Sequence, residues 1–186
     1  MSPHPRADEG LATAVLEIER HAAEAGWDQP ARLFALVETA RLVAREPQLA
    51  DSLGDTPLTP VEQEGIAAGR PFEDQLTAIS WPATVHGCAA LVERVVLSPD
   101  VEAQLPDEPD RAASFASEHP DRQEVRIVAA ATRTGESYCA LRLRAHDDDE
   151  SVLTGPDLVP GLLRLVQATL DDHPDTSPDG SEETQR

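Results

Sequence analysis

Lysine and asparagine are absent from this chain of 186 residues, so every basic side chain other than histidine is an arginine. Alanine, arginine, aspartate, glutamate and proline are plentiful, which is the pattern that a GC-rich genome favours. Aromatic residues make up only 3% of the chain, so a platform of rings for stacking nucleotide bases is not expected. The composition therefore reflects a mutational bias and argues against one common mode of nucleic-acid binding.

Several catalytic and targeting signatures are also missing. The sequence contains no glycine-rich phosphate loop, no HExxH motif and no GxSxG motif. No segment approaches the about 18 consecutive apolar residues of a membrane-spanning helix, and residues 1–10 lack the apolar core of a signal peptide. We therefore expect a cytoplasmic protein whose two cysteines, Cys88 and Cys139, are reduced and buried in apolar segments without zinc-ligand spacing.

Negative charge is what the chain has in excess. It carries 35 acidic side chains against 15 basic ones, a formal net charge of −20 with neutral histidines. Such a charge repels nucleic-acid phosphates and anionic lipid surfaces, so neither is expected as a partner. Hydrophobic residues make up 40% of the chain, and folding at this size buries about 70% of the surface, which is enough for one core.

The pattern along the chain predicts one domain over residues 9–172, with disordered ends at 1–8 and 173–186 and an acidic, proline-rich insertion at 98–120. Helices are expected at 9–25, 39–45, 71–79, 110–118 and 158–171, and strands at 32–37, 61–66, 85–97, 124–131 and 137–145. A five-residue connection containing Gly135 joins the last two strands as a hairpin. The order predicts an α+β fold with a mainly antiparallel sheet of four to five strands, packed against the N- and C-terminal helices.

The alternation of side chains gives the last strand two different faces. Its apolar residues Cys139, Leu141 and Leu143 share one face, whereas Arg142 and Arg144 point to the other. The sequence thus predicts that one face of this strand belongs to the core and that the other is polar.

The strongest candidate for a charged site is the acidic run Asp147, Asp148, Asp149 and Glu150, which follows the last strand. Four neighbouring carboxylates suit Mg²⁺ or Ca²⁺, although the spacing and the glycine of an EF-hand loop are absent. The alternative, which we prefer, is a solvated acidic turn. No metal or cofactor is predicted here.

Two further sets of residues are weak candidates. If residues 61–66 form a strand, Glu62 and Glu64 lie on one face and would share a proton in acid–base chemistry, or they would protect an exposed strand edge. His86 lies close to Cys88, but the packing of a buried thiol beside a core histidine is favoured over a catalytic pair. We therefore assign no catalytic residue.

Several phrases taken together resemble an uncharacterised family of small acidic actinobacterial proteins, and the resemblance covers about residues 11–171. The absence of lysine agrees with such a source. The resemblance implies no activity, substrate or catalytic residue. The phrases that carry it are VLEIERH at 15–21, AGWDQP at 25–30, LTPVEQE at 58–64, LRLRAHD at 141–147 and LTGPDLVPGL at 153–162.

An acidic surface, a small complete core and the lack of a catalytic constellation favour a non-enzymatic binding or adaptor protein whose partner is another protein. The alternative is an enzyme of unrecognised type with a site near Glu62, Glu64, His86 and residues 147–150. A third hypothesis is an acidic mimic of nucleic acid, which would need carboxylates ordered in phosphate-like rows.

Overall fold

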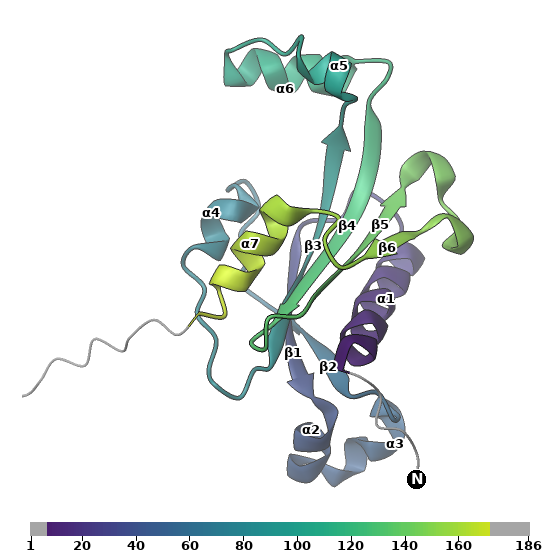
Figure 1. The fold of residues 1–186 in the computed structure, drawn as a ribbon, viewed down its shortest axis with the longest axis vertical. Helices are drawn as coiled ribbons and strands as arrows, with labels where there is room; N and C mark the ends of the chain where they lie inside the picture. Colours follow the sequence, from purple (N-terminus) through teal and green to yellow (C-terminus); the bar gives the residue numbers. More distant parts are fainter. Residues whose placement is uncertain (1–6, 172–186) are drawn as a thin grey trace, which may run out of the picture.

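One antiparallel sheet of six strands organises the molecule, and the computed structural model describes residues 7–171 of it (Figure 1). The strand order is β2-β1-β3-β4-β5-β6, and each neighbouring pair is antiparallel. The expected α+β class is confirmed, but the sheet has six strands instead of four to five. The strands are β1 (Arg32–Glu38), β2 (Leu58–Gln63), β3 (Gly87–Val96), β4 (Gln123–Thr132), β5 (Ser137–Leu143) and β6 (Leu153–Gly155).

Seven α-helices accompany the sheet within the described residues. Their bounds follow the sequence pattern closely, although the first helix begins at Ala7 and the last ends at Ala168. The predicted disordered ends otherwise lie outside the described residues. The helices are α1 (Ala7–Ala25), α2 (Thr39–Arg45), α3 (Ala50–Leu53), α4 (Phe72–Leu76), α5 (Pro99–Glu102), α6 (Pro109–Glu118) and α7 (Pro160–Ala168).

Two strand assignments need correction. The edge strand β2 runs from Leu58 to Gln63, three residues earlier than expected, with Pro60 inside it. An edge strand tolerates proline, because only one side of its backbone takes part in the ladder. The sixth strand, β6, has only three residues and ends on a glycine, so it gives almost no periodic signal in the sequence.

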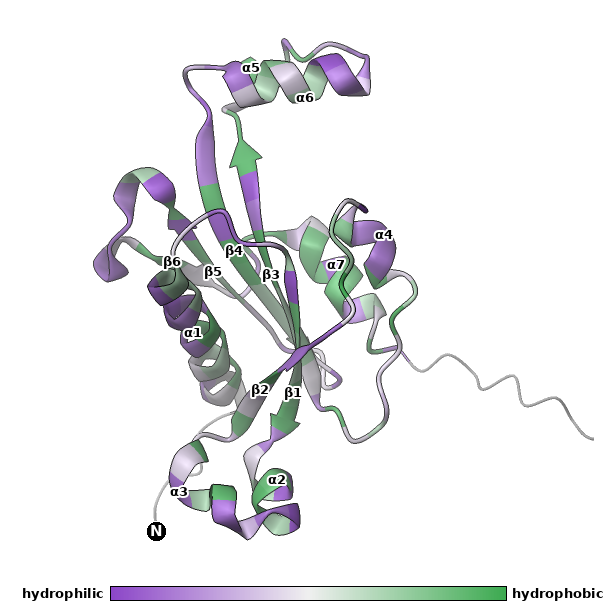
Figure 2. Ribbon diagram, turned by 180° about the vertical axis from the view of Figure 1, so that it is seen from behind, coloured by the Kyte–Doolittle hydropathy of each residue, from purple (hydrophilic) through white to green (hydrophobic). Residues whose placement is uncertain are grey.

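Both faces of the sheet are covered, and each carries its own apolar core. Helix α1 packs on one face, and α4 and α7 pack on the other (Figure 1). Figure 2 shows that hydrophobic residues concentrate in the central strands between these layers. The face of β5 that was expected to be polar is therefore covered by α1, and Arg142 on it is buried.

The long strand β3 shows why its sequence is almost continuously apolar. Ala89 and Leu91 pack towards α1, whereas Cys88, Ala90 and Val92 pack towards α7, and all five are buried. A strand that is buried on both faces cannot alternate apolar and polar residues. This confirms the expected central strand.

Two groups of short helices extend the molecule beyond the sheet. Helices α2 and α3 lie at one end, and α5 and α6 lie at the other, at the tip of the β3–β4 hairpin (Figure 1). Residues 98–122, which contain α5 and α6, are called the arm below. The expected acidic loop insertion thus folds into two helices. Among residues 7–171, no helix is long and apolar enough to cross a membrane.

Candidate binding surface

The two glutamates proposed at the sheet edge do not lie on one strand face as a carboxylate pair. Glu62 lies on β2 and accepts hydrogen bonds from Arg32 on β1, at 2.7 Å from Nε and 2.5 Å from Nη2. The Arg32 guanidinium holds the pKa of Glu62 below its usual range, chiefly through these hydrogen bonds. Glu64 lies beyond the end of the strand and is exposed, so the two carboxylates do not share a strand face.

His86 and Cys88 have different structural roles, and their side chains are not linked by a hydrogen bond among the described residues. His86 directly precedes β3, and its backbone N–H donates to the Leu36 carbonyl over 3.0 Å. The Cys88 thiol is buried towards α7, with its Sγ 3.2 Å from Oγ1 of Thr169. Burial raises the pKa of Cys88 to about 11, so the thiol is protonated near neutral pH and is a poor nucleophile.

The second cysteine behaves in the same way. Cys139 is buried and free, and burial raises the pKa of its thiol as well. A thiol kept neutral and away from solvent packs as a small apolar side chain. The environment of both cysteines is that of core residues.

The acidic run after β5 is largely engaged by the protein itself. Asp147 accepts a hydrogen bond from the Trp27 indole over 2.9 Å, and Asp149 accepts one from Arg142 Nη2 over 2.6 Å. Asp148 accepts bonds of 2.8 Å from both the backbone N–H and the hydroxyl of Ser151. The turn is therefore more than a solvated acidic segment. No group of three or more His, Cys, Asp or Glu side chains in residues 7–171 could hold a metal ion.

Arg142 is the centre of the charges under α1. Its Nε lies 2.5 Å from Oε1 of Glu19 and its Nη2 lies 2.9 Å from Oε2, and both side chains are only 3% exposed. These hydrogen bonds and the contact with Asp149 raise the pKa of Arg142. A buried pair of this kind stabilises the fold only while both charges are present, because either charge alone is costly in a core.

Arg126 lies directly across from Arg142 on β4 and is completely buried. Its Nη2 donates to the Gly26 carbonyl and, over 3.0 Å, to Oε1 of Glu93. The guanidinium carbon lies 4.4 Å from the centre of the Trp27 ring, a distance at which cation–π attraction operates. Nε and Nη1 of Arg126 have no hydrogen-bond partner among the described residues.

These contacts hold the C-terminal half of α1 and the turn at Trp27 against three neighbouring strands, β3, β4 and β5. The role of the arginines under α1 is therefore structural. Sequence reasoning missed the partnership of Glu19, Arg126 and Arg142, which joins residues far apart in the chain. Arginines in the middle of otherwise apolar strands were the available signal.

The arm is built differently from this body. Within it, Val101 is buried, and the Phe115 and His119 rings lie 5.2 Å apart. Helix α6 has no buried residue, although it is ten residues long. Just below the arm, Val95 and Val96 are exposed by 44% and 40%.

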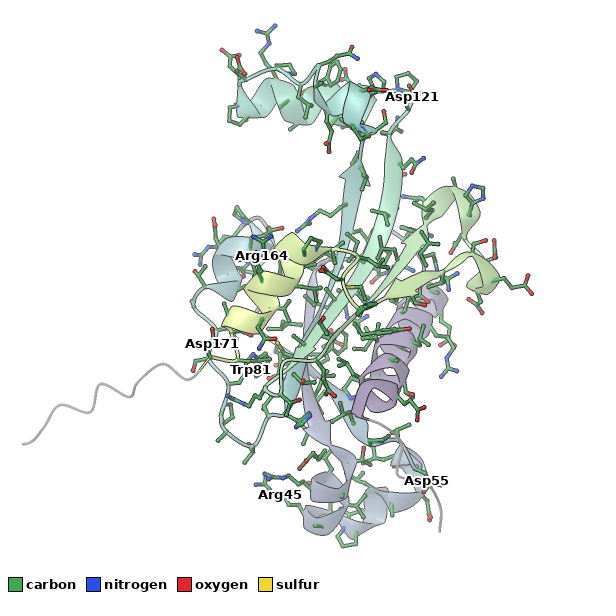
Figure 3. The ribbon with its side chains drawn as sticks, in the orientation of Figure 1. Arg45, Asp55, Trp81, Asp121, Arg164 and Asp171 are labelled. Carbon is green, nitrogen blue, oxygen red and sulfur yellow. The ribbon has the colours of Figure 1, made fainter. Side chains whose placement is uncertain are left out.

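The charges of the arm are unbalanced and lie on a projecting element. Residues 98–122 contain two arginines, Arg111 and Arg122, and seven acidic residues. The arm stands off the end of the sheet, with Asp121 at one extreme of the molecule and Asp55 near the other (Figure 3). The acidic residues of the arm are Asp100, Glu102, Asp107, Glu108, Asp110, Glu118 and Asp121.

The fold and this surface define a small α+β protein with a helix-covered antiparallel sheet and an acidic, helical arm. The chain belongs to the family of PPA1309-like proteins, whose sequence model matches residues 11–171. This confirms the family resemblance that the sequence motifs indicate. Comparison with curated proteins and with solved structures finds no match.

Proposed function

We propose that this protein is a non-enzymatic binding module that recognises a protein partner with a basic surface through the arm. The observation that carries the proposal is the arm itself, an acidic helical extension of a core hairpin that buries little of its own surface. A helix such as α6, with no buried residue, adds little to the stability of the body. The presence of this helix at the tip of the long β3–β4 hairpin is therefore better explained by contact with another molecule.

The sign of the charge selects the partner. With seven acidic and two basic residues, the arm attracts a surface rich in lysine and arginine, and complementary charges also accelerate the encounter. The adjacent exposed Val95 and Val96 add apolar area, which gives a bound partner contacts that salt does not screen.

The carboxylates that contact Arg126 and Arg142 are, by contrast, not available to a partner. Glu19, Glu93 and Asp149 are each hydrogen-bonded to an arginine of this chain, so their charge is compensated internally. Of the charged groups on the arm, the pair of Glu108 and Arg111 is loose, with 3.6 Å between the charged atoms and both side chains more than 70% exposed. Exposed, weakly paired carboxylates are the ones that remain available to a partner.

The test begins with affinity purification of the tagged full chain from its host. Candidates are then purified and their binding is measured directly with the wild-type chain and with a triple variant, Asp107→Asn, Glu108→Gln and Asp110→Asn. A matched control carries Glu46→Gln, Asp51→Asn and Asp55→Asn, which removes the same charge from the opposite end of the molecule. All six side chains are exposed.

We expect the arm variant to bind the partner at least about threefold more weakly at low salt, because exposed ion pairs contribute about 0.2–1 kcal/mol each and three are removed. The control should bind as the wild type does, and the difference should shrink as salt is added. Equal binding by the wild-type chain and the arm variant would overturn the proposal. Recovery of a tightly bound metabolite in place of a protein would favour the enzyme hypothesis instead.

A further inference from the structure

A second candidate site lies away from the arm, in a hollow beside Trp81. The hollow has a volume of about 380 Å³ and lies between the loop after β2 and residues 78–82. Its apolar wall consists of Leu33, Ile66, Ile79 and Trp81. This volume suits a small molecule or a single long side chain.

The Trp81 wall is held in place from two directions. Its indole Nε1 donates to Oγ1 of Thr169 over 2.9 Å, and its carbonyl accepts from Nη2 of Arg133 over 3.0 Å. Figure 3 shows Trp81 beside the end of α7, close to Asp171. A wall that is fixed before binding costs a ligand little ordering free energy.

One carboxylate lines this hollow. Glu64 is exposed, and no hydrogen bond or ion pair connects its side chain with another residue in 7–171. Its neighbour Glu62 is engaged by Arg32 and lines an adjoining hollow of about 530 Å³, together with Glu64 and Ile66. Glu64 therefore places one carboxylate, unpaired among the described residues, beside the apolar wall, while Arg133 is held behind the wall by the Trp81 and Pro82 carbonyls.

We propose that this hollow binds a primary alkylammonium group, with its apolar chain against Trp81, Ile66 and Ile79 and its cation beside Glu64. A neutral apolar ligand would use only the wall, and an anion would be repelled by Glu64 and by the overall charge. The ammonium belongs either to a free amine or to a lysine side chain of another protein, since the chemistry is the same for both.

The test compares n-hexylammonium with hexanol, which has the same apolar chain without the charge. Binding is followed by isothermal titration calorimetry on the full chain and by Trp81 fluorescence in a Trp27→Phe variant, where Trp81 is the only tryptophan. A peptide with a single lysine and blocked ends tests the second source of the ammonium. Saturation by the peptide points to a partner's lysine, and saturation by hexylammonium alone points to a free amine.

We expect hexylammonium to bind about two- to fivefold more tightly than hexanol, which is the contribution of an exposed ion pair. The preference should disappear in Glu64→Gln and persist in Glu150→Gln, which removes an exposed acid elsewhere. Equal binding of hexanol, an unchanged preference in Glu64→Gln, or no saturable binding of any probe would each overturn the proposal. Because the arm is intact in all these variants, the result is independent of the function proposed above.

Discussion

In the body of the protein, Arg126 and Arg142 are buried and meet the carboxylates of Glu93 and Glu19 within the fold. On the arm, acidic side chains outnumber basic ones and α6 buries none of its residues. The same excess of acid thus serves two purposes. Internal carboxylates compensate the charge of buried arginines, while those of the arm remain exposed. This difference predicts that charge changes at the buried ion pairs of the body affect stability, whereas charge changes on the arm affect binding.

The largest effect is expected at the buried pair. Replacement Arg142→Met leaves Glu19 as an uncompensated charge that is 3% exposed, so the free energy of unfolding should fall by about 3–5 kcal/mol. Urea denaturation measures the loss. The double variant Arg142→Met with Glu19→Leu should recover most of it, because no charge is then left buried.

Arg144 provides the matched control, since it lies just beyond the end of β5, in a short 3-10 turn, and its side chain is 38% exposed. The replacement Arg144→Met should change stability far less than Arg142→Met. If the two replacements lowered the free energy of unfolding equally, the buried ion pair between Arg142 and Glu19 would not be what holds α1 on the sheet.

Cys88 allows the body to be probed by pH. Burial raises the pKa of its thiol from 9.0 to about 11 in the folded state. Well below pH 9 the thiol is protonated whether the chain is folded or not, so stability is unaffected there. Between pH 9 and 11 only the unfolded thiol ionises, and the free energy of unfolding should fall by up to about 2 kcal/mol, at about 1.4 kcal/mol for each pH step of one.

The Cys88→Ala variant separates this effect from the titration of other groups. Its unfolding free energy will be lower at every pH because of the cavity, but it should decline less steeply above pH 9. Denaturation curves at several pH values make the comparison. Parallel declines in the two proteins would show that the Cys88 thiol is not protected from ionisation.

A smaller effect is expected at the acidic turn. Asp148 accepts hydrogen bonds from the backbone N–H and the hydroxyl of Ser151, so Asp148→Ala should lower stability by about 0.5–1 kcal/mol. Glu150 lies two residues away and its side chain is exposed, so Glu150→Ala should leave stability nearly unchanged. Thermal melts of both variants distinguish the two hypotheses. If Asp148 caps the turn, only Asp148→Ala lowers the melting temperature. If the turn is merely solvated, the two variants melt at the same temperature.

Much of the fold could be predicted from the sequence, because strong periodic patterns determine it. The helix at 7–25, the strand at 87–96 and the hairpin that follows the arm are clear from apolar spacing and turn residues. The strand β6 was missed because three residues establish no period. The burial of Arg142 under α1 was missed for another reason. The alternation of residues along a strand shows on which face a side chain lies, but not which distant helix packs on that face.

The candidate surfaces illustrate the same limit of local patterns. The acidic insertion was visible in the sequence, whereas its position at the tip of a ten-residue strand pair depends on pairing between β3 and β4. The hollow at Trp81 joins residues from β1, the loop after β2 and the segment before β3. Only tertiary structure brings these segments together, so Glu64 could be proposed from sequence but not its apolar neighbours.

The smallest change in stability is expected on the arm. The triple variant Asp107→Asn, Glu108→Gln and Asp110→Asn should unfold within about 0.5 kcal/mol of the wild type, since exposed substitutions rarely exceed this. Urea denaturation measures it. A larger loss would show that the acids of the arm stabilise the body, and the arm and the body would then not differ in the role of their charges.

The most direct test measures one partner's affinity and the protein's stability together, for the arm triple variant and for Arg144→Met. The account predicts that the arm variant keeps its stability and loses at least about threefold in affinity at low salt, whereas Arg144→Met binds as the wild type does. A partner that binds the arm variant as tightly as the wild type would contradict the central claim.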